Sequence, residues 1–551
     1  MSAQSEILSI EGLTVDLPPW ADRRHAVQEV SLALRHNEIL CVVGESGSGK
    51  SVMARSILGL STSRHVQPSA GRILYSGEDL LKASPERMRA LRGSRIAMIF
   101  QEPMTALNPV LTIGRQIEEA VAVHLPLPRH ERREKVLSML AAVQLPDPAR
   151  IHAAHPHQVS GGQRQRAMIA MALILEPDIL IADEPTTALD VTTQAQVLAL
   201  IREMQRKRRM AVLFITHDFG VVAEIADRIA VMQHGQLVEH GAALDVLERP
   251  QHPYTRSLLA AVPDLAPAAP RHDFVGAPVA LKVSGLQKSY RGKGIFRSSS
   301  TKAVHAAKDV ALEIRRGETV GIVGESGSGK STVARCIARL VQPDAGEIRV
   351  GEVDFGRLGA RALRQNRKRI QTVFQDPYGS LDPRQSVGSL IAEGPRIHGA
   401  TAEASRDRAL KLLALVGLDA RSADRYPHEF SGGQRQRIGL ARALALDPDV
   451  LIADEPVSAL DVSVQAQVLR LLADIRERLG LSVLFITHDL RVAGQVCDSI
   501  AVMRHGEIVE FGRTEAVFNA PMHPYTQTLF AAVPGRAWSL RRSAVAARDP
   551  Q

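Results

Sequence analysis

The stretch Gly44–Ser51, GESGSGKS, occurs a second time without any change at Gly324–Ser331. Both copies match G-x-x-x-x-G-K-[ST], the pattern of a phosphate-binding loop. An apolar run precedes each copy, at residues 39–43 and 319–323, and a stretch compatible with a helix follows. Glycines let backbone N–H groups approach phosphate oxygens, and the N-terminus of a helix adds partial positive charge. The repeated strand, loop and helix therefore predict two nucleotide sites.

Two side chains of each loop carry the chemistry that this motif predicts. Lys50 and Lys330 would reach the β- and γ-phosphates, and Ser51 and Ser331 would be ligands of Mg²⁺. The predicted nucleotide-binding residues of the first copy are Gly44, Glu45, Ser46, Gly47, Ser48, Gly49, Lys50, Ser51 and Val52. Those of the second copy are Gly324, Glu325, Ser326, Gly327, Ser328, Gly329, Lys330, Ser331 and Thr332.

Length and composition indicate a globular protein of two domains. The chain has 551 residues, of which 45% are hydrophobic and 23% are charged, and its sequence repeats from about residue 280. No apolar run reaches the roughly 18–20 residues that span a bilayer. The N-terminal MSAQSEILSIEG lacks the basic segment and apolar core of a signal peptide. The net charge of +9 fits a solvated basic surface as well as an anionic partner, so it selects no function.

The pattern of the two halves predicts an α/β fold with two P-loop domains, each with a mixed β core and a helical insert. Strands are expected before each loop, at residues 8–17, 26–34, 281–290 and 303–314. The predicted parts are domain 1 at 1–262, a Pro/Ala-rich linker at 263–279, domain 2 at 280–534, and a flexible basic tail at 535–551. Helical inserts are expected at about 104–159 and 378–430, and a mobile basic loop at 291–302.

Carboxylates follow a buried-strand pattern in each half. Asp183 and Asp454 end ILIAD and VLIAD, which places them at the carboxyl edge of the sheet beside the phosphate loop. There they would hold Mg²⁺, and Glu184 and Glu455, one residue on, would polarise an attacking water. The in-phase repeat is what raises this Asp-Glu pair above an ordinary surface pair.

The motif SGGQRQR begins at Ser160 and again at Ser431, 271 residues later. Serine caps a helix, and we expect the helix to begin near Gln163 or Gln434. Such a helix end attracts an anion, but each phosphate loop is already a complete cradle. A second anion site therefore implies the nucleotide of a partner domain. The residues of this predicted contact are Ser160, Gly161, Gly162 and Gln163, with Ser431, Gly432, Gly433 and Gln434.

Phosphate loop, glutamine loop, SGGQ, Asp-Glu and a later histidine occur in that order in both halves, which resembles the ATP-binding-cassette (ABC) ATPases. The resemblance implies two cassettes that pack head to tail around two ATP molecules, so that Lys50 works with Ser431–Gly433 and Lys330 with Ser160–Gly162. It also implies that Gln101 and Gln375 complete Mg²⁺ and sense a membrane partner. His217 and His488 match the switch histidine at the γ-phosphate. Residues 188–190 and 459–461 match the loop that links the two sites.

Smaller motifs resemble the ATPases of peptide importers, including those of oligopeptides, dipeptides, glutathione and microcin C. They are QEPMTALNP and QDPYGSLDP, DVTTQAQVL and DVSVQAQVL, and HPYT at 252–255 and 523–526. The resemblance implies a peptide-translocating ATPase on the cytoplasmic face of a bacterial inner membrane. Its partners would be two permease subunits and a periplasmic substrate-binding protein, with no nucleic acid. Its cofactors would be ATP and Mg²⁺.

Cysteines set this chain apart from many of those ATPases, which carry a cysteine cluster after HPYT. The three cysteines here are Cys41, Cys336 and Cys497, and none follows either copy of the motif. They share no C-x-x-C spacing, which predicts neither a disulfide framework nor a zinc site and fits a reducing cytoplasm. We therefore predict no iron–sulfur cluster.

A different function, in a soluble tandem ABC protein that acts on ribosomes, is the alternative. Proteins of that kind resemble this one in having two cassettes and no membrane span. They join their halves by a long charged helical linker, whereas the linker here is short and rich in proline. The sequence therefore favours the importer.

The two nucleotide sites are not identical in sequence. ABC proteins usually stack adenine on an aromatic residue after the first strand, and alignment of the halves puts Tyr290 there in the second half but Leu17 in the first. Trp20 and His25 are the alternatives to Leu17. Thr332 offers a hydroxyl for the α-phosphate where Val52 offers none. These differences predict weaker ATP binding at the site built on Lys50.

Overall fold

The chain forms two compact units. The first unit holds residues 1–189 and 193–262, and the second holds residues 190–192 and 263–551. The computed structural model describes residues 5–61, 63, 65–101, 106–186, 189–268, 274–290, 304–376, 379–458 and 460–546. The predicted basic loop at 291–302 lies outside the described residues. No helix in the described ranges is long and apolar enough to cross a membrane.

The strands begin and end close to the predicted positions. Those of the first half are β1 (Glu6–Asp16), β2 (His25–Arg35), β3 (Ile39–Val43), β4 (Pro68–Tyr75), β5 (Glu78–Asp79), β6 (Ile96–Ile99), β7 (Ile179–Asp183), β8 (Ala211–Ile215), β9 (Arg228–Gln233) and β10 (Gln236–Ala242). Those of the second half are β11 (Val279–Tyr290), β12 (Val304–Arg315), β13 (Thr319–Val323), β14 (Ala345–Val350), β15 (Val353–Asp354), β16 (Ile370–Val373), β17 (Val450–Asp454), β18 (Ser482–Ile486), β19 (Ser499–Arg504) and β20 (Glu507–Arg513).

The helices of the two halves follow the same order. Those of the first half are α1 (Lys50–Ile57), α2 (Pro85–Leu91), α4 (Ile113–His124), α5 (Arg129–Ala142), α6 (Pro148–Ala153), α7 (Gly161–Leu173), α8 (Val191–Arg208), α9 (Phe219–Ile225), α10 (Ala243–Glu248) and α11 (Pro253–Ala261). Those of the second are α12 (Lys330–Ile337), α13 (Ala360–Asn366), α14 (Val387–Ile397), α15 (Ala402–Leu415), α16 (Gly432–Leu444), α17 (Val462–Leu479), α18 (Leu490–Val496), α19 (Thr514–Asn519), α20 (Pro524–Ala531) and α21 (Arg536–Ala546).

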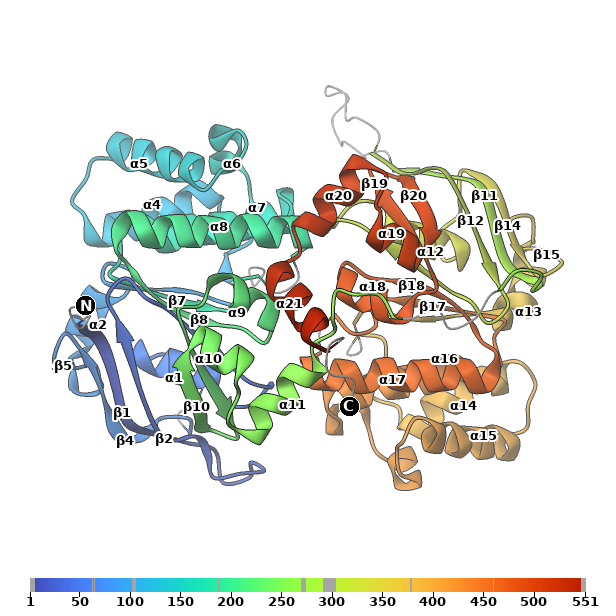
Figure 1. Ribbon diagram of the computed structural model, residues 1–551, viewed down its shortest axis with the longest axis horizontal. Helices are drawn as coiled ribbons and strands as arrows, with labels where there is room; N and C mark the ends of the chain where they lie inside the picture. The colour runs from blue at the N-terminus through green and yellow to red at the C-terminus, as the bar shows by residue number, and fades with distance from the viewer. Residues whose placement is uncertain are drawn as a thin grey trace. The chain divides into compact units, whose positions relative to one another are not determined.

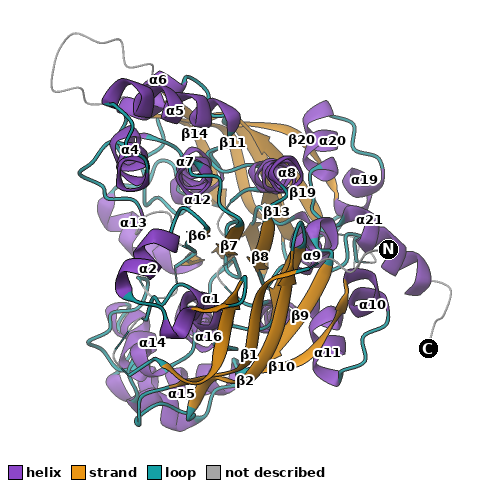
Figure 2. Ribbon diagram, turned by 90° about the vertical axis from the view of Figure 1, so that its left-hand side faces the viewer, coloured by secondary structure: helices purple, strands orange, loops and turns teal. Residues whose placement is uncertain are grey.

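Each unit contains two sheets, as far as its residues are described. One has the order β2-β1-β4-β5 in the first unit and β12-β11-β14-β15 in the second, and its strands are antiparallel. The other sheet has the order β10-β9-β3-β8-β7-β6 in the first unit and β16-β17-β18-β13-β19-β20 in the second. Its strands are parallel except for the antiparallel pairs β9–β10 and β19–β20. Figure 2 shows β6, β7 and β8 side by side, as their pairing requires. The fold is the predicted α/β arrangement.

The short parallel strands are buried along their whole length. Every residue of β3, β7 and β8 is buried, and so is every residue of β13, β17 and β18. Strands covered on both faces read as continuous apolar runs, which is why the sequence shows these runs so clearly. Helix α1 packs Met53 and Ala54 into the core formed by the first unit's two sheets. The phosphate loop therefore starts and ends in rigid elements.

The helical inserts lie apart from the sheets of their own unit. Helices α4, α5 and α6 lie together with α7 (Figure 1), and they contact one another and α7. Helices α14 and α15 contact α16 in the same way. The inserts thus bridge the end of β6 or β16 and the SGGQ helix.

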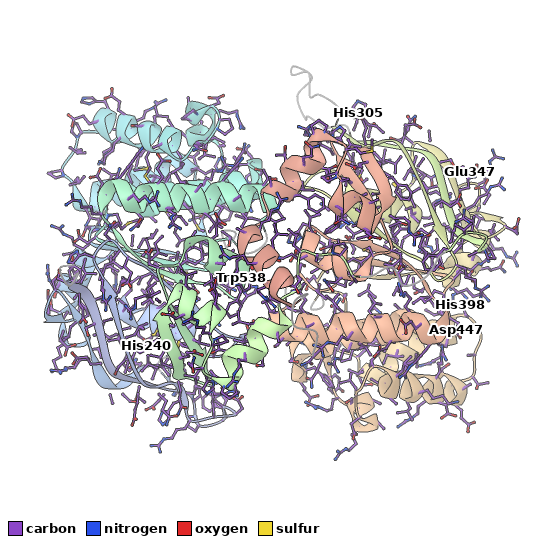
Figure 3. All side chains as sticks on the ribbon, in the orientation of Figure 1. His240, His305, Glu347, His398, Asp447 and Trp538 are labelled. Carbon is purple, nitrogen blue, oxygen red and sulfur yellow. The ribbon has the colours of Figure 1, made fainter. Side chains whose placement is uncertain are left out.

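The C-terminal tail differs from the predicted flexible segment, because residues 536–546 form helix α21. Trp538, labelled in Figure 3, lies within this helix and is only 4% exposed. The Leu265 N–H donates to Ser539 Oγ at 2.9 Å, so the start of the predicted linker lies against this helix. Residues 547–551 lie outside the description.

The first residues of the linker are fixed to the second unit at two further points. The Ala268 N–H donates to the Gly494 carbonyl at 3.0 Å, and Gln495 Nε2 donates to the Ala266 carbonyl at 3.1 Å. Both partners lie on α18. The predicted extended linker is therefore not a separate body over residues 264–268, and residues 269–273 lie outside the described part.

Candidate functional site

Each phosphate loop joins a buried strand to a helix, β3 to α1 and β13 to α12. Gly44 and Gly49 have φ of 147° and 101°, in the region that favours glycine. A Cβ at Gly44 would collide with the Met232 carbonyl, and one at Gly49 with the Ala26 carbonyl. The glycines therefore serve the packing of the loop against its own unit as well as any approach to phosphate.

The loop lysines are buried and hydrogen-bonded to their own loops. Lys50 Nζ donates to the carbonyls of Gly44 and Glu45, both at 2.7 Å, and to Ser48 Oγ at 3.1 Å. Lys330 Nζ donates to the equivalent carbonyls at 2.8 Å. Burial lowers the pKa of Lys330. Each ammonium therefore lies within its loop, where a bound phosphate would have to replace these carbonyls as the hydrogen-bond acceptor.

The loop serines meet the predicted metal-binding aspartates. Ser51 Oγ donates to Asp183 Oδ1 at 2.8 Å, and Ser331 Oγ to Asp454 Oδ1 at 3.1 Å. Burial raises the pKa of both aspartates. Asp183 Oδ2 is buried and has no hydrogen-bond partner among the described residues.

These oxygens fit Mg²⁺, which in nucleotide sites takes one or two protein oxygens and completes its shell with phosphate and water. A cation would satisfy Asp183 Oδ2, which has no hydrogen-bond partner among the described residues. In the described ranges no group of three or more His, Cys, Asp or Glu is arranged to hold a metal ion.

Each predicted water-polarising glutamate lies between a glutamine and a histidine. Gln101 Nε2 donates to Glu184 Oε2 at 2.9 Å, and His217 Nδ1 lies 3.3 Å from Glu184 Oε1. The second unit repeats this with Gln375 at 2.8 Å and His488 at 3.3 Å from Glu455 Oε2. The structure therefore brings together three side chains that are far apart in the sequence.

The backbone of both glutamates is in the left-handed region, with φ of 49° for Glu184 and for Glu455. Such a conformation costs about 1–3 kcal/mol in a residue other than glycine, and it persists where surrounding contacts fix it. Here the Glu184 N–H donates to the Ile215 carbonyl at 3.0 Å, and the Glu455 N–H to Ile486 at 2.9 Å. Sequence patterns gave no sign of this strain.

The second glutamate and histidine are electrostatically coupled. Burial acts to raise the pKa of Glu455, but the contact with His488, the charge of Lys330 and the Ser458 hydrogen bond together lower the net pKa. Burial acts to lower the pKa of His488, but the contact with Glu455 and the charge of Asp489 together raise the net pKa. Near neutral pH the carboxylate is therefore ionised and can accept a hydrogen bond from water.

The SGGQ motifs form the expected helix N-termini, although the helices begin at Gly161 and Gly432, two residues earlier than predicted. Ser160 Oγ accepts from the Gln163 N–H at 3.2 Å, and the Gln163 side chain accepts from the Ser160 N–H at 3.2 Å. Ser431 and Gln434 form the same capping box. This reciprocal cap explains the early start, because it fixes the first turn.

Glycine in the SGGQ motifs also has a packing role. A Cβ at Gly162 would lie 2.7 Å from Thr193 Cγ2 of α8, whereas a Cβ at Gly161 would meet nothing within 4 Å. In the second unit a Cβ at Gly433 would collide with Val464 of α17. The second glycine therefore permits helix packing, whereas a Cβ at the first would meet nothing in one unit and only an ordinary contact with Leu460, at 3.6 Å from Gly432, in the other.

The residues predicted to lie at the adenine differ between the halves in their exposure and contacts. Tyr290 ends β11 with 43% of its surface exposed, and Lys288 Nζ lies 5.6 Å from its ring centroid. Of the alternatives to Leu17, Trp20 is 76% exposed and packs edge-on against His65, and His25 Nδ1 pairs with Asp16 at 2.7 Å.

Parts of two predicted motifs are not described. Residues 102–105 and 377–378 of the glutamine loops lie outside the described ranges, and so do Ala188 and Ala459 of the loops that link the two sites.

Sequence reasoning treated HPYT only as a mark of the family and missed a contact with the phosphate loop. The Glu45 N–H donates to Tyr254 Oη at 3.1 Å, and the Glu325 N–H to Tyr525 Oη at 3.2 Å. The repeat of HPYT at a constant distance from the other motifs was the available signal.

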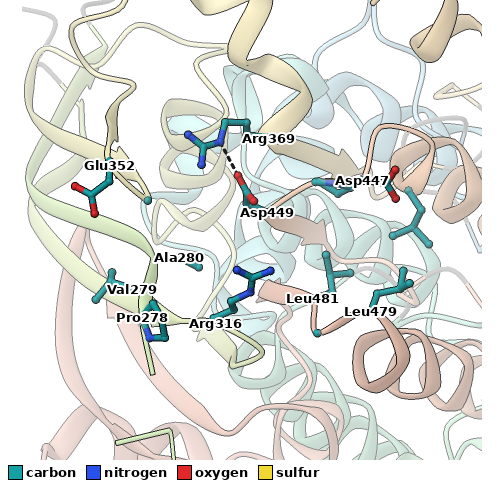
Figure 4. Close-up of a pocket in the computed structure, with 14 residues that line it drawn as sticks. Pro278, Val279, Ala280, Arg316, Glu352, Arg369, Asp447, Asp449, Leu479 and Leu481 are labelled. Carbon is teal, nitrogen blue, oxygen red and sulfur yellow. Dashed lines mark hydrogen bonds and ion pairs between the residues drawn. The ribbon is translucent and has the colours of Figure 1, made fainter. Parts of the chain in front are cut away.

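A cavity of about 360 Å³ in the second unit lies at the other end of the strands from the phosphate loop (Figure 4). Arg369 and Asp449, which line it, come just before β16 and β17 and form an ion pair of 2.5 Å. In the first unit Tyr75 of β4 donates to Asp178 Oδ2 at 2.5 Å, and Val350 takes the corresponding place on β14. None of the residues that line the cavity belongs to the phosphate loop, so the cavity is not part of the phosphate site.

Comparison with known families agrees with this geometry. The family described as "ABC transporter" matches residues 27–187 and 307–458. The family described as "Oligopeptide/dipeptide transporter, C-terminal region" matches residues 238–282 and 509–548, which include both HPYT motifs. These matches give the ribosome-associated alternative no support.

Relatives match over nearly the whole chain. The glutathione import ATP-binding protein GsiA of Salmonella choleraesuis (strain SC-B67) is 46% identical over 559 residues, which cover 96% of this chain and 90% of that protein. GsiA of Escherichia coli (strain K12) is 45% identical over 557 residues, with 96% and 89% covered. The solved dimeric structure of the ATP-binding cassette MJ0796 with ADP and Pi is 32% identical, with a TM-score of 0.38, and covers 42% of this chain and 98% of that one. The chain belongs to the ABC transporter family, and it is an ATPase of a peptide-class importer with both cassettes on one polypeptide.

Proposed function

We propose that the protein hydrolyses ATP at two composite sites and so drives the import of a peptide or peptide-like solute through separate permease subunits. The observation that carries the proposal is the Gln–Glu–His cluster, which both units repeat beside a phosphate loop. Two equivalent clusters favour two working sites over one catalytic and one degenerate site.

The clusters fit a role in positioning the attacking water. A carboxylate whose pKa is lowered, as that of Glu455 is, stays ionised near neutral pH. It can then accept a hydrogen bond from a water and orient that water. Gln375 and His488 both contact Oε2 of this carboxylate, which restricts its orientation and so the place where the water can sit. Bound Mg²⁺ would neutralise charge on the β- and γ-phosphates and would be held by Ser331 and Asp454.

The SGGQ helix ends complete each site from the opposite cassette in this proposal. Ser160 and Ser431 are exposed helix caps whose N-terminal turns can receive an anion. The site on Lys50 would then use Ser431–Gly433, and the site on Lys330 would use Ser160–Gly162. ATP would close the two units, and hydrolysis would let them separate.

The partners follow from the import function of the relatives. Two permease subunits would dock on the helical inserts, because these lie between the glutamine that contacts the catalytic glutamate and the SGGQ helix. A substrate-binding protein would deliver the solute from outside. The protein would lie on the cytoplasmic face of the inner membrane, where ATP is available.

Glutathione is the first solute to test, because the relatives are named for glutathione import. The nucleotide sites described above do not select the solute. Selection would instead lie in the permease and the binding protein.

Reconstitution with the permeases tests the proposal. The protein would be purified with the two permease proteins, placed in vesicles with ATP on its side, and assayed for uptake of labelled glutathione and of di- and oligopeptides. We expect ATP-dependent uptake of one solute class that stops in the Glu184→Gln, Glu455→Gln variant. Stable association with ribosomes and none with permeases would contradict the proposal.

A further inference from the structure

The tyrosine of each HPYT motif touches the phosphate loop of its own unit. Tyr254 Oη accepts the Glu45 N–H at 3.1 Å across 209 residues of sequence, and Tyr525 Oη accepts the Glu325 N–H at 3.2 Å across 200 residues. The loop residue is the same in both units. A contact repeated at this sequence distance is a built feature of the fold.

The rest of the motif places the tyrosine. His252 caps α11, and its Nδ1 accepts the Tyr254 N–H at 3.2 Å, while Pro253 occupies the first helical position. The carboxylate of Glu239 on β10 accepts the N–H groups of Gln251 and His252 at 2.7 and 3.1 Å. The helix start is therefore fastened to a strand.

The second unit has the same fastening. Glu510 of β20 accepts the N–H groups of Met522 and His523 at 2.8 and 3.1 Å, and His523 Nδ1 accepts the Tyr525 N–H at 3.1 Å. Glu510 and His523 thus fix the start of the helix that carries Tyr525.

The contact holds one particular peptide unit of the loop. Lys50 Nζ binds the Gly44 carbonyl, and Tyr254 binds the Glu45 N–H, so the peptide between Gly44 and Glu45 is held at both of its polar atoms. A lysine that turns to a phosphate must release the carbonyl. The hydrogen bond from the Glu45 N–H to Tyr254 does not involve the lysine and can persist when the lysine moves.

We propose that Tyr254 and Tyr525 are positioning residues that keep the first peptide of each phosphate loop in place while the lysine moves to the nucleotide. The inference rests on the proposed function of the loops as ATP sites. It assigns a role to the C-terminal region of each cassette, which thereby influences ATP affinity from the edge of the sheet.

The two tyrosine rings differ in one contact with a neighbouring side chain. The Arg504 guanidinium lies 4.8 Å from the ring centroid of Tyr525, a cation–π contact. The position 271 residues earlier is Gln233, which carries no charge. Burial raises the pKa of Tyr525 to about 12, so its hydroxyl is neutral at physiological pH. The second unit should depend more strongly on its tyrosine.

The test compares Tyr254→Phe, Tyr525→Phe and the double variant in the full chain, with Tyr426→Phe on the exposed part of the helical insert as the control. The removal of one hydrogen bond should raise the KM for ATP about two- to tenfold while kcat changes less than about twofold. Hydrogen exchange of the Glu45 and Glu325 amides should become faster in the matching variant. Arg504→Gln should give a smaller effect in the same direction.

Nucleotide affinity is also measured directly, by equilibrium binding of labelled ATP in the Glu184→Gln, Glu455→Gln background. Weaker binding with an unchanged unfolding midpoint supports the positioning role. An unchanged KM and affinity in both Phe variants overturns it, and so does a loss of activity that merely follows a lower midpoint. If the wild-type protein binds no ATP, the proposed function fails as well; if it binds and the Phe variants bind equally, only this inference fails.

Discussion

Ser51 and Asp183 share a 2.8 Å hydrogen bond although 132 residues separate them in the sequence. The bond joins the start of α1 to the end of β7, and the same bond joins Ser331 to Asp454 in the second unit. Both partners lie at the carboxyl edge of the parallel sheet, where α/β proteins bind their ligands. The residues predicted to bind Mg²⁺ in each cassette therefore lie at this edge.

Replacement of both glutamates should separate ATP binding from hydrolysis. We expect the Glu184→Gln, Glu455→Gln variant to retain ATP and to lose steady-state turnover. Glutamine keeps the shape of the side chain, but its neutral amide polarises a water much less than a carboxylate does. Each single variant should also turn over much more slowly than wild type. ATPase rates and retention of labelled nucleotide check this, and a single variant with a wild-type rate would show that its site does not catalyse.

The Glu455–His488 pair should give the second unit a pH-dependent stability. The raised pKa of His488 contributes stability that is complete below about pH 6.5 and is lost as the pH rises through the folded value. The lowered pKa of Glu455 contributes above about pH 4.5 and is lost as the pH falls through its folded value. The joint contribution is therefore largest between about pH 4.5 and 6.5.

Denaturant unfolding of wild type and His488→Gln across this range measures the effect. The difference in unfolding free energy should be greatest near pH 5–6 and should shrink above pH 7, and Glu455→Gln should behave alike. A difference that stays constant with pH would mean that the pair has no electrostatic role.

The two ATP sites should differ in affinity. We expect the site on Lys50 to bind ATP about tenfold or more weakly, since Leu17 cannot stack a base as Tyr290 can and Val52 lacks the hydroxyl of Thr332. Tyr290→Ala should weaken the second site, and Leu17→Ala should leave the first nearly unchanged. Val52→Thr should strengthen the first site. Site-resolved binding in the double Gln background decides the matter, and equal affinities would refute the difference.

Charge changes on the helical inserts should uncouple transport from hydrolysis. Val110 is 76% exposed and precedes α4, and the Arg384 side chain is 92% exposed and precedes α14. Val110→Glu and Arg384→Glu should reduce transport severalfold while the ATPase of the isolated protein persists, because neither residue touches the nucleotide loop. Arg357→Glu, at an 89% exposed side chain near β15, serves as the control. A permease that cross-links elsewhere on the cassettes would reject this docking surface.

Much of the fold could be predicted because its signals are local. The five-residue apolar strands and the glycine loops repeat in the sequence, and burial on both faces leaves an unmistakable apolar run. The left-handed backbone of Glu184 and the contact of Tyr254 with Glu45 could not be predicted, because they depend on long-range packing. The arginines of the tail suggested a solvated segment, whereas residues 536–546 form a helix in which Trp538 is buried.

The contacts of residues 264–268 with α18 and α21 decide where the polypeptide could be divided. A second cassette produced as an independent protein would have to start near Pro263, because a later start would remove the backbone that Ser539 and Gln495 bind. The proline-rich linker looks like the natural place to divide the chain, but its first residues, 264–268, are packed against the second unit. A split version of this ATPase should therefore be cut directly after Val262.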